Sequence, residues 1–275
     1  MKIDSHQHFW NYHPIKDAWI SDAMKVIQQD FMPADLLPLL QKNDIDGCIA
    51  VQADQSETET RFLLQLAQDN DFIMGVVGWV DFRSNDIEER LQYFSQFEKL
   101  KGFRHIVQGE SEDDFLLRAD FCNGIAQLEK YNFTYDLLIL PKHLSVATEF
   151  VKRFPKQNFV IDHLAKPNFK EANFTNWENG IRELSTYKNV FCKLSGMVTE
   201  ADWENWKAED FNYCLDVLVG NFGIERLMFG SDWPVSLLAA SYEQSSAIVK
   251  NYFSKFSEEE QHKIWGGNAI KFYNL

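Results

Sequence analysis

Short apolar runs alternate with longer amphipathic stretches along the whole chain, which predicts strands that are each followed by a helix. In the stretches 57–70 and 86–98, apolar residues recur at helical spacing, and Pro33 and Pro141 stand where the first turn of a helix would begin. Most of the apolar runs are rich in Val, Ile and Phe, which is typical of strands. The predicted strands are residues 2–6, 47–53, 73–80, 100–107, 133–138, 159–163, 190–194 and 227–232.

The spacing of these strands predicts the fold class. Their starts lie about 25 to 45 residues apart, enough for one strand, one helix and their connections. Eight such units without a GxGxxG turn favour a closed parallel (β/α)8 barrel, the TIM barrel, over a doubly wound sheet. No linker divides the chain, so residues 1–275 are predicted to form a single α/β domain, ending in two short helices broken at Gly266 and Gly267.

The widest interval, between the first two predicted strands, contains the aromatic-rich stretch HFWNYHPIKDAWISDAMKVIQQDF. In a barrel, this stretch would be a long loop at the end where catalytic residues gather. One interpretation is that it forms a lid or a wall of the substrate site. A helical segment that only covers the end of the barrel would show the same aromatic-rich pattern. Both interpretations stay open from the sequence.

Candidate chemistry begins in the first strand, where His6 and His8 are separated by one residue. Side chains alternate along a strand, so both imidazoles are expected on one face, together with Asp4. Two imidazoles packed against helices would be costly to bury, which favours the barrel interior. There they can hold a metal ion or a substrate oxygen.

Two further candidates end apolar runs elsewhere in the chain. His163 ends the sixth predicted strand, and Asp232 ends the eighth. The carboxyl ends of barrel strands share one rim, so both are expected to meet His6 and His8 there. The convergence of three imidazoles and one carboxylate indicates a functional site.

Taken in order, several short motifs resemble the amidohydrolase superfamily and, within it, a branch of lactonases. The motifs are IDSHQHFW at the start, VQAD after the second strand, KGFRHIVQ at the fourth, IDHLAKP at the sixth, GSDWP at the eighth and GGNAIKFYNL at the end. The resemblance implies a hydrolase that opens the ring of a sugar-acid lactone, such as a fucono- or rhamnono-lactone, to the free acid. It also admits carboxylated lactones of the pyrone and muconate type.

The resemblance bears on the metal content. Many members of the superfamily bridge two metal ions with a carboxylated lysine at the end of strand four and a histidine at the end of strand five. Here Lys101 stands at the start of strand four, and strand five offers Tyr135 and Asp136 but no histidine. The expectation is therefore one divalent ion, preferably zinc, or no metal. The expected ligands are His6, His8, His163 and Asp232.

The same four residues form the predicted catalytic group. Asp232 is expected to take a proton from the attacking water, and the imidazoles polarise the lactone carbonyl through a metal ion or by hydrogen bonds. Arg104 and His105 are adjacent in the fourth strand, so only one of them faces the interior, where Arg104 could bind substrate oxygens. The candidate substrate-binding residues are Arg104, His105, Gln52, Trp79 and Lys193, with Asp81 and Ser195 near the same rim.

The remaining histidines and the cysteines predict no chemistry. His13 and His143 are expected at the surface or in loops, and His262 is expected to be structural. The four cysteines lie far apart without a CxxC pair, which is typical of small buried hydrophobes in a reducing compartment. The start of the chain has no apolar signal segment, so a cytoplasmic location is expected.

The net charge of the chain limits the classes of partner that it can bind. The chain has 27 Lys and Arg against 41 Asp and Glu, a formal net charge of −14, so its surface repels nucleic acid and anionic lipid. A small-molecule substrate is expected, and the scarcity of arginines near the rim favours a neutral lactone over a dicarboxylate. The alternatives are a metal-dependent decarboxylase of the same superfamily and a barrel that only binds a ligand. The oligomeric state stays open.

Overall fold

The computed structural model describes residues 1–275, and its centre is one sheet of eight strands arranged in chain order. Each strand pairs in parallel with the next. The strands are buried along almost their whole length, which explains why they occur as apolar runs. They are β1 (Ile3–Gln7), β2 (Gly47–Val51), β3 (Ile73–Gly78), β4 (Leu100–His105), β5 (Thr134–Leu137), β6 (Phe159–Ile161), β7 (Val190–Leu194) and β8 (Leu227–Phe229).

The first and last strands meet and close the sheet into a barrel. Beyond the end of β8, Trp233 forms a β-bridge with Gln7, and the His8 N–H donates to the Trp233 carbonyl at 2.8 Å. The Asp232 N–H donates to the His6 carbonyl, also at 2.8 Å. The predicted (β/α)8 barrel is therefore confirmed, and its closure brings Asp232 next to β1.

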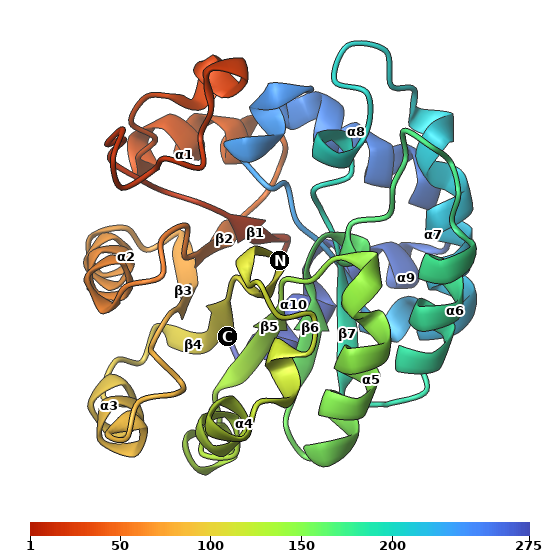
Figure 1. The fold of residues 1–275 in the computed structure, drawn as a ribbon. Helices are drawn as coiled ribbons and strands as arrows, with labels where there is room; N and C mark the ends of the chain where they lie inside the picture. The colour runs from red at the N-terminus through yellow and green to blue at the C-terminus, as the bar shows by residue number, and fades with distance from the viewer.

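Helices surround the barrel, and a hydrophobic core of 65 buried residues fills the space between strands and helices (Figure 1). The predicted helix at 57–70 is present, and the Ser56 hydroxyl caps it by accepting from the Glu59 N–H. No helix combines the length and the apolar content that crossing a membrane requires. The helices are α1 (Pro33–Lys42), α2 (Glu57–Asp69), α3 (Ile87–Phe94), α4 (Ala119–Ile125), α5 (Leu144–Arg153), α6 (Thr175–Leu184), α7 (Asn212–Phe222), α8 (Tyr242–Phe253), α9 (Glu258–His262) and α10 (Asn268–Tyr273).

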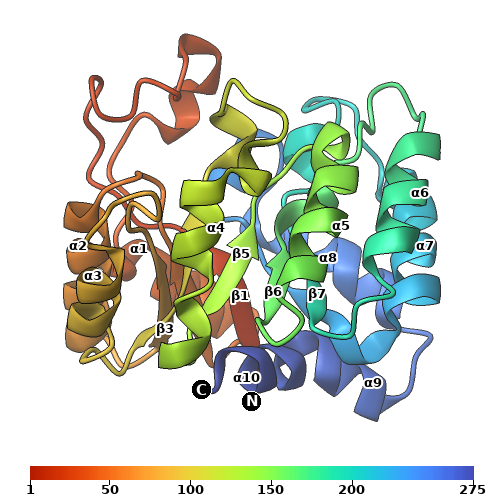
Figure 2. The same ribbon diagram turned by 60° about the horizontal axis from the view of Figure 1, so that its bottom comes forward.

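The C-terminal helix α10 closes the end of the barrel at which the strands begin (Figure 2). Its Phe272 and Tyr273 belong to an apolar cluster of 10 buried residues that also contains interior residues of the strands. The predicted break in this tail is a π-helical turn, Lys263–Gly267, between α9 and α10. Gly266 is needed there, because a Cβ would lie 2.4 Å from the Met1 carbonyl oxygen.

At the opposite end, six of the eight strands stop before their predicted ends, and in β6 and β8 this difference moves a candidate residue out of the strand. β6 ends at Ile161 and β8 at Phe229. The backbone then leaves the extended conformation, and His163 and Asp232 have φ angles of 53° and 57°. These values lie in the left-handed region, which no strand residue adopts. Both candidate residues therefore lie in loops just beyond their strands, on the side of the barrel away from α10 (Figure 2).

Candidate active site

A β-bulge in β1 brings His6 and His8 to the barrel interior. Between Asp4 and Gln7 the strand advances three residues while β2 advances two, from Cys48 to Ala50. The extra residue interrupts the strict alternation of faces. Asp4 consequently turns to the helix layer, where its Oδ2 accepts from the Tyr242 hydroxyl at 2.9 Å. The expectation that Asp4 shares a face with the two histidines is wrong for this reason.

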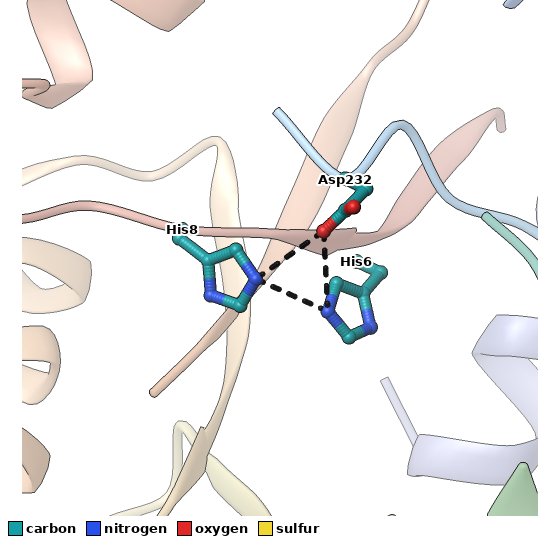
Figure 3. A group of neighbouring side chains, drawn as sticks. All are labelled: His6, His8 and Asp232. Atoms are coloured by element: carbon teal, nitrogen blue, oxygen red, sulfur yellow. Dashed lines mark hydrogen bonds and ion pairs between the residues drawn. The ribbon is translucent and has the colours of Figure 1, made fainter. Parts of the chain in front are cut away.

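The four residues predicted to form the site come together at the rim. The Nε2 atoms of His6 and His8 lie 3.2 Å apart. Asp232 Oδ1 lies 3.9 Å from His6 Nε2 and 3.5 Å from His8 Nε2 (Figure 3). His163 contributes a third Nε2 atom, 3.8 Å from the same carboxylate oxygen. Three imidazole nitrogens thus surround one carboxylate oxygen, and all four side chains are buried.

His163 occupies a strained turn. Four consecutive residues, His163 to Lys166, have φ angles between 52° and 58°, a left-handed turn without glycine. Such a conformation is costly for L-amino acids and persists only where the surroundings enforce it. Here the Lys166 N–H donates to the His163 carbonyl at 2.7 Å, and the Trp177 indole N–H donates to the Leu164 carbonyl at 2.6 Å. The turn directs His163 toward Asp232.

The donor set fits a divalent metal ion. His8 Nδ1 lies 2.7 Å from the Val51 carbonyl oxygen, which can only accept, so Nδ1 carries a proton and Nε2 is the ring atom that faces the site. Burial lowers the pKa of His163 to about 4 and holds that of His6 well below its usual value. Burial alone would raise the pKa of Asp232, but His163 and His8 hold it below its usual value. Neutral imidazoles and an ionised carboxylate are the forms that bind zinc.

A buried charge network adjoins His6 on the side of its Nδ1 atom. Lys193 Nζ lies 3.1 Å from His6 Nδ1, 2.5 Å from Asp136 Oδ2 and 3.0 Å from Asp162 Oδ1. Arg104 Nη1 lies 3.0 Å from Asp162 Oδ2 and 3.3 Å from His6 Nε2. The two cations and two carboxylates balance one another, as buried charges must. The network therefore holds the His6 ring from several directions.

His8, His163 and Asp232 lie in the wall of a cavity of about 370 Å³. Another part of that wall is the aromatic stretch after β1, which contributes Trp10, Trp19 and Met24. This stretch contains a short 3-10 helix, Asp22–Ile27, and lies over the catalytic end of the barrel (Figure 2). Of the two interpretations left open by the sequence, the structure favours a substrate wall.

Arg104 faces the barrel interior and lines the cavity, whereas His105 points to the helix layer. His105 stacks on Phe115 with ring centroids 4.7 Å apart, and its Nε2 lies 2.7 Å from Glu110 Oε1. The Trp79 indole N–H donates to His105 Nδ1 at 3.2 Å. Neither His105 nor Trp79 lines the cavity, because strand alternation turns His105 away and Trp79 is hydrogen-bonded to it. Their contact with substrate stays a prediction.

Gln52 and Lys193 are completely buried and do not line the cavity either. The Gln52 amide donates to the Arg104 carbonyl at 3.2 Å, and Lys193 belongs to the charge network. Both are placed to support Arg104 and His6 from behind the cavity, and their contact with substrate stays a prediction. Ser195, 2.9 Å from His163 Nδ1, orients that ring, and Asp81 pairs with Arg83 away from the cavity.

His143 lies in the short turn Pro141–His143 between β5 and α5, which is one of the two placements expected for it, and it is completely buried. Its Nδ1 accepts from the Leu140 N–H at 3.1 Å, at the start of the turn that leads into α5. Its side chain therefore serves helix initiation. His13 and His262 are exposed, as expected for residues without chemistry.

Several cavity residues carried no prediction. Lys166 and Glu200 face one another in the wall, beside Gln108 and Trp203. Lys166 stands within the motif IDHLAKP, three residues after His163. This short distance from a candidate residue was the one sequence signal that could have placed Lys166 near the site. Glu200 follows β7, and no local pattern marks it, because its approach to Lys166 depends on how two separate loops pack.

The sequence matches the family model described as amidohydrolase over residues 3–275. A protein of Burkholderia multivorans named L-fucono-1,5-lactonase is 41% identical over 286 residues, covering 100% of this chain and 96% of that protein. A protein of the same name from Burkholderia ambifaria is 32% identical over 280 residues, with coverage of 100% and 96%.

The fold agrees with a solved relative as well. A crystal structure of an amidohydrolase from Burkholderia multivorans, described with bound Zn, has a TM-score of 0.97 at 40% identity and covers 100% of this chain and 99% of that one. The resemblance read from the motifs is thus confirmed over the full length. The chain belongs to the amidohydrolase family.

Proposed function

We propose that this protein hydrolyses the ring ester of a sugar-acid lactone. The observation that carries the proposal is the convergence of four side chains, His6, His8, His163 and Asp232, of which the last three line a cavity with aromatic and hydrogen-bonding surfaces. The two relatives named L-fucono-1,5-lactonase support it, since the chain aligns with them from end to end.

In the proposed reaction, a water next to Asp232 loses a proton to the carboxylate and attacks the lactone carbonyl. Asp232 is suited to this role because its neighbours keep it ionised in a buried site. Arg104 lines the same cavity and has an Nε–H without a partner in the protein. Its fixed positive charge is placed to stabilise the oxygen on which negative charge develops. Return of the proton to the ring oxygen completes the opening to the hydroxy acid.

A divalent ion held by His6, His8, His163 and Asp232 would add Lewis-acid polarisation of the carbonyl. We expect elemental analysis of the purified protein to find at most one such ion per chain, with zinc preferred by the imidazole-rich set. The reason is that Arg104 and Asp136 occupy the interior of strands four and five, where a second ion would need ligands. Two ions per active chain would contradict this proposal.

The charges of the wall favour a neutral substrate. Both cations that line the cavity are already paired, Arg104 with Asp162 at 3.0 Å and Lys166 with Glu200 at 2.8 Å. Apart from the Arg104 Nε–H, no cationic group of the wall is free, so a dicarboxylate would bury at least one charge without a partner, which is unfavourable. Trp10, Trp19 and Trp203 instead offer apolar faces on which a sugar ring can stack.

We expect kcat/KM for neutral sugar lactones to exceed that for pyrone dicarboxylate and muconolactone by at least about tenfold. A pH-indicator assay over a panel of lactones, corrected for spontaneous opening, measures the ratio. The panel contains L-fucono- and L-rhamnono-lactones and the two anionic lactones. A tenfold preference for the anionic lactones would contradict the claim that the charges of the cavity wall favour a neutral substrate. Release of CO₂ from aromatic acids, with no lactone opened, would favour the decarboxylase alternative instead.

A cytoplasmic location and a small-molecule partner complete the proposal. All four cysteines are unpaired and three of them are buried, which supports a reducing compartment. The acidic surface supports the absence of nucleic-acid and membrane partners. Fractionation of the source cells, followed by detection of the protein, tests the location.

A further inference from the structure

Lys166 and Glu200 form an ion pair within the cavity wall. Lys166 Nζ lies 2.8 Å from Glu200 Oε1, and the two side chains keep 17% and 27% of their area exposed. Lys166 comes from the left-handed turn after β6, and Glu200 ends the short 3-10 helix Val198–Glu200 after β7. Two separate loops thus each contribute one charge to the surface that a bound molecule contacts.

The position of Lys166 is enforced by the fold. It ends the strained turn that begins at His163, so one rigid segment holds both side chains against the same cavity. The Trp203 indole N–H donates to the Thr199 carbonyl at 2.9 Å. This hydrogen bond fixes an aromatic ring in the wall three residues after Glu200. Strained backbone of this kind is retained mainly at functional sites.

We propose that the Lys166–Glu200 pair determines the charge of the substrate that this cavity accepts. The ammonium group donates to hydroxyl oxygens of a neutral lactone, and the carboxylate accepts from hydroxyl groups. Glu200 at the same time neutralises Lys166 and so denies a substrate carboxylate its counter-ion. This inference rests on the proposed lactonase function and extends it to the residues that select among lactones.

The two partners therefore have opposite effects on selectivity. Loss of the Glu200 charge leaves a free cation in the wall, which attracts an anionic lactone. Loss of the Lys166 charge leaves a free carboxylate, which repels it. A pair that only held the two loops together would behave differently. Removing either partner would then loosen the same loops and lower kcat/KM for neutral and anionic lactones by the same factor.

The test compares Glu200→Gln and Lys166→Met with the wild type, using L-fucono-1,5-lactone and muconolactone. We expect Glu200→Gln to raise the ratio of kcat/KM, anionic over neutral, by about tenfold or more, mainly through KM, and Lys166→Met to lower it. Glu225→Gln is the matched control: it breaks an exposed pair with Lys263, 2.7 Å apart and outside the cavity, and should leave the ratio unchanged.

Equal losses on both lactones in the two variants, or an unchanged ratio in Glu200→Gln, would overturn the inference. If the wild type opened no lactone at all, the proposed function would fail, and the pair would be tested by calorimetric binding of muconolactone. Binding at least tenfold tighter to Glu200→Gln than to the wild type would then still support charge selection by the pair, and equal binding would refute it. The thermal midpoint of each variant shows that it is folded.

Discussion

Replacing Asp232 by Asn is expected to lower kcat by about 10²- to 10⁴-fold, the usual contribution of a positioned general base. The amide has nearly the same shape, but it cannot take the proton from water. The backbone should tolerate the change, because Asn is among the residues that adopt the left-handed conformation observed here, with φ of 57°. Steady-state kinetics with the preferred lactone measures the loss.

The control for this variant is Asp113→Asn, which removes a carboxylate from an exposed ion pair with Lys142, outside the cavity. Its kcat should equal that of the wild type, and both variants should keep the wild-type circular dichroism spectrum. A value of kcat close to wild type for Asp232→Asn at the pH optimum would rule out Asp232 as the base and leave the imidazoles to activate the water.

Replacing Lys193 by Met is expected to destabilise the protein by about 3–5 kcal/mol, the usual cost of removing one partner from a buried ion pair. The change leaves Asp136 and Asp162 facing each other in the barrel interior without the ammonium group that lies 2.5 and 3.0 Å from them. The contact of the ammonium group with His6 Nδ1, at 3.1 Å, is lost as well. The midpoint of thermal unfolding should fall, and kcat should fall with it because His6 loses its support.

Lys142→Met serves as the comparison, since it removes an ammonium group from an exposed pair with Asp113 and should leave the midpoint nearly unchanged. The two lysines have the same length and charge and differ in burial. If Lys193→Met kept the wild-type midpoint and raised only KM, Lys193 would be a substrate contact, as the sequence alone suggested, and its placement in the charge network would not matter for folding.

Much of the site was predictable because it depends on two simple regularities. His6, His8, His163 and Asp232 each stand at or just beyond the end of a predicted strand, and parallel strands in a barrel bring their carboxyl ends to one rim. The pattern of apolar and polar positions placed each residue at the end of a strand. The barrel topology then predicted that the four residues lie close together, although none of their contacts was known. The number of strand–helix units, together with the absence of a GxGxxG turn, was enough to choose the barrel.

The supporting residues were not predictable in the same way. His105 and Arg104 are neighbours in β4, and alternation shows that one faces inward but not which one. Asp4 was assigned the wrong face because a bulge in β1 is visible only in its register with β2. Glu200 has no local signal, since its role depends on Lys166 in another loop.

The sequence by itself therefore determined the barrel and the four residues at its rim, because periodicity along one chain segment and the order of segments carry that information. Only the tertiary structure decided which polar groups face the cavity and which lie behind it. Lys193 and Lys166 illustrate the difference: the first is sealed in the interior between Asp136 and Asp162, and the second lines the cavity against Glu200. The physical reason is that burial and charge pairing arise between residues far apart in the chain, through register, loop packing and closure.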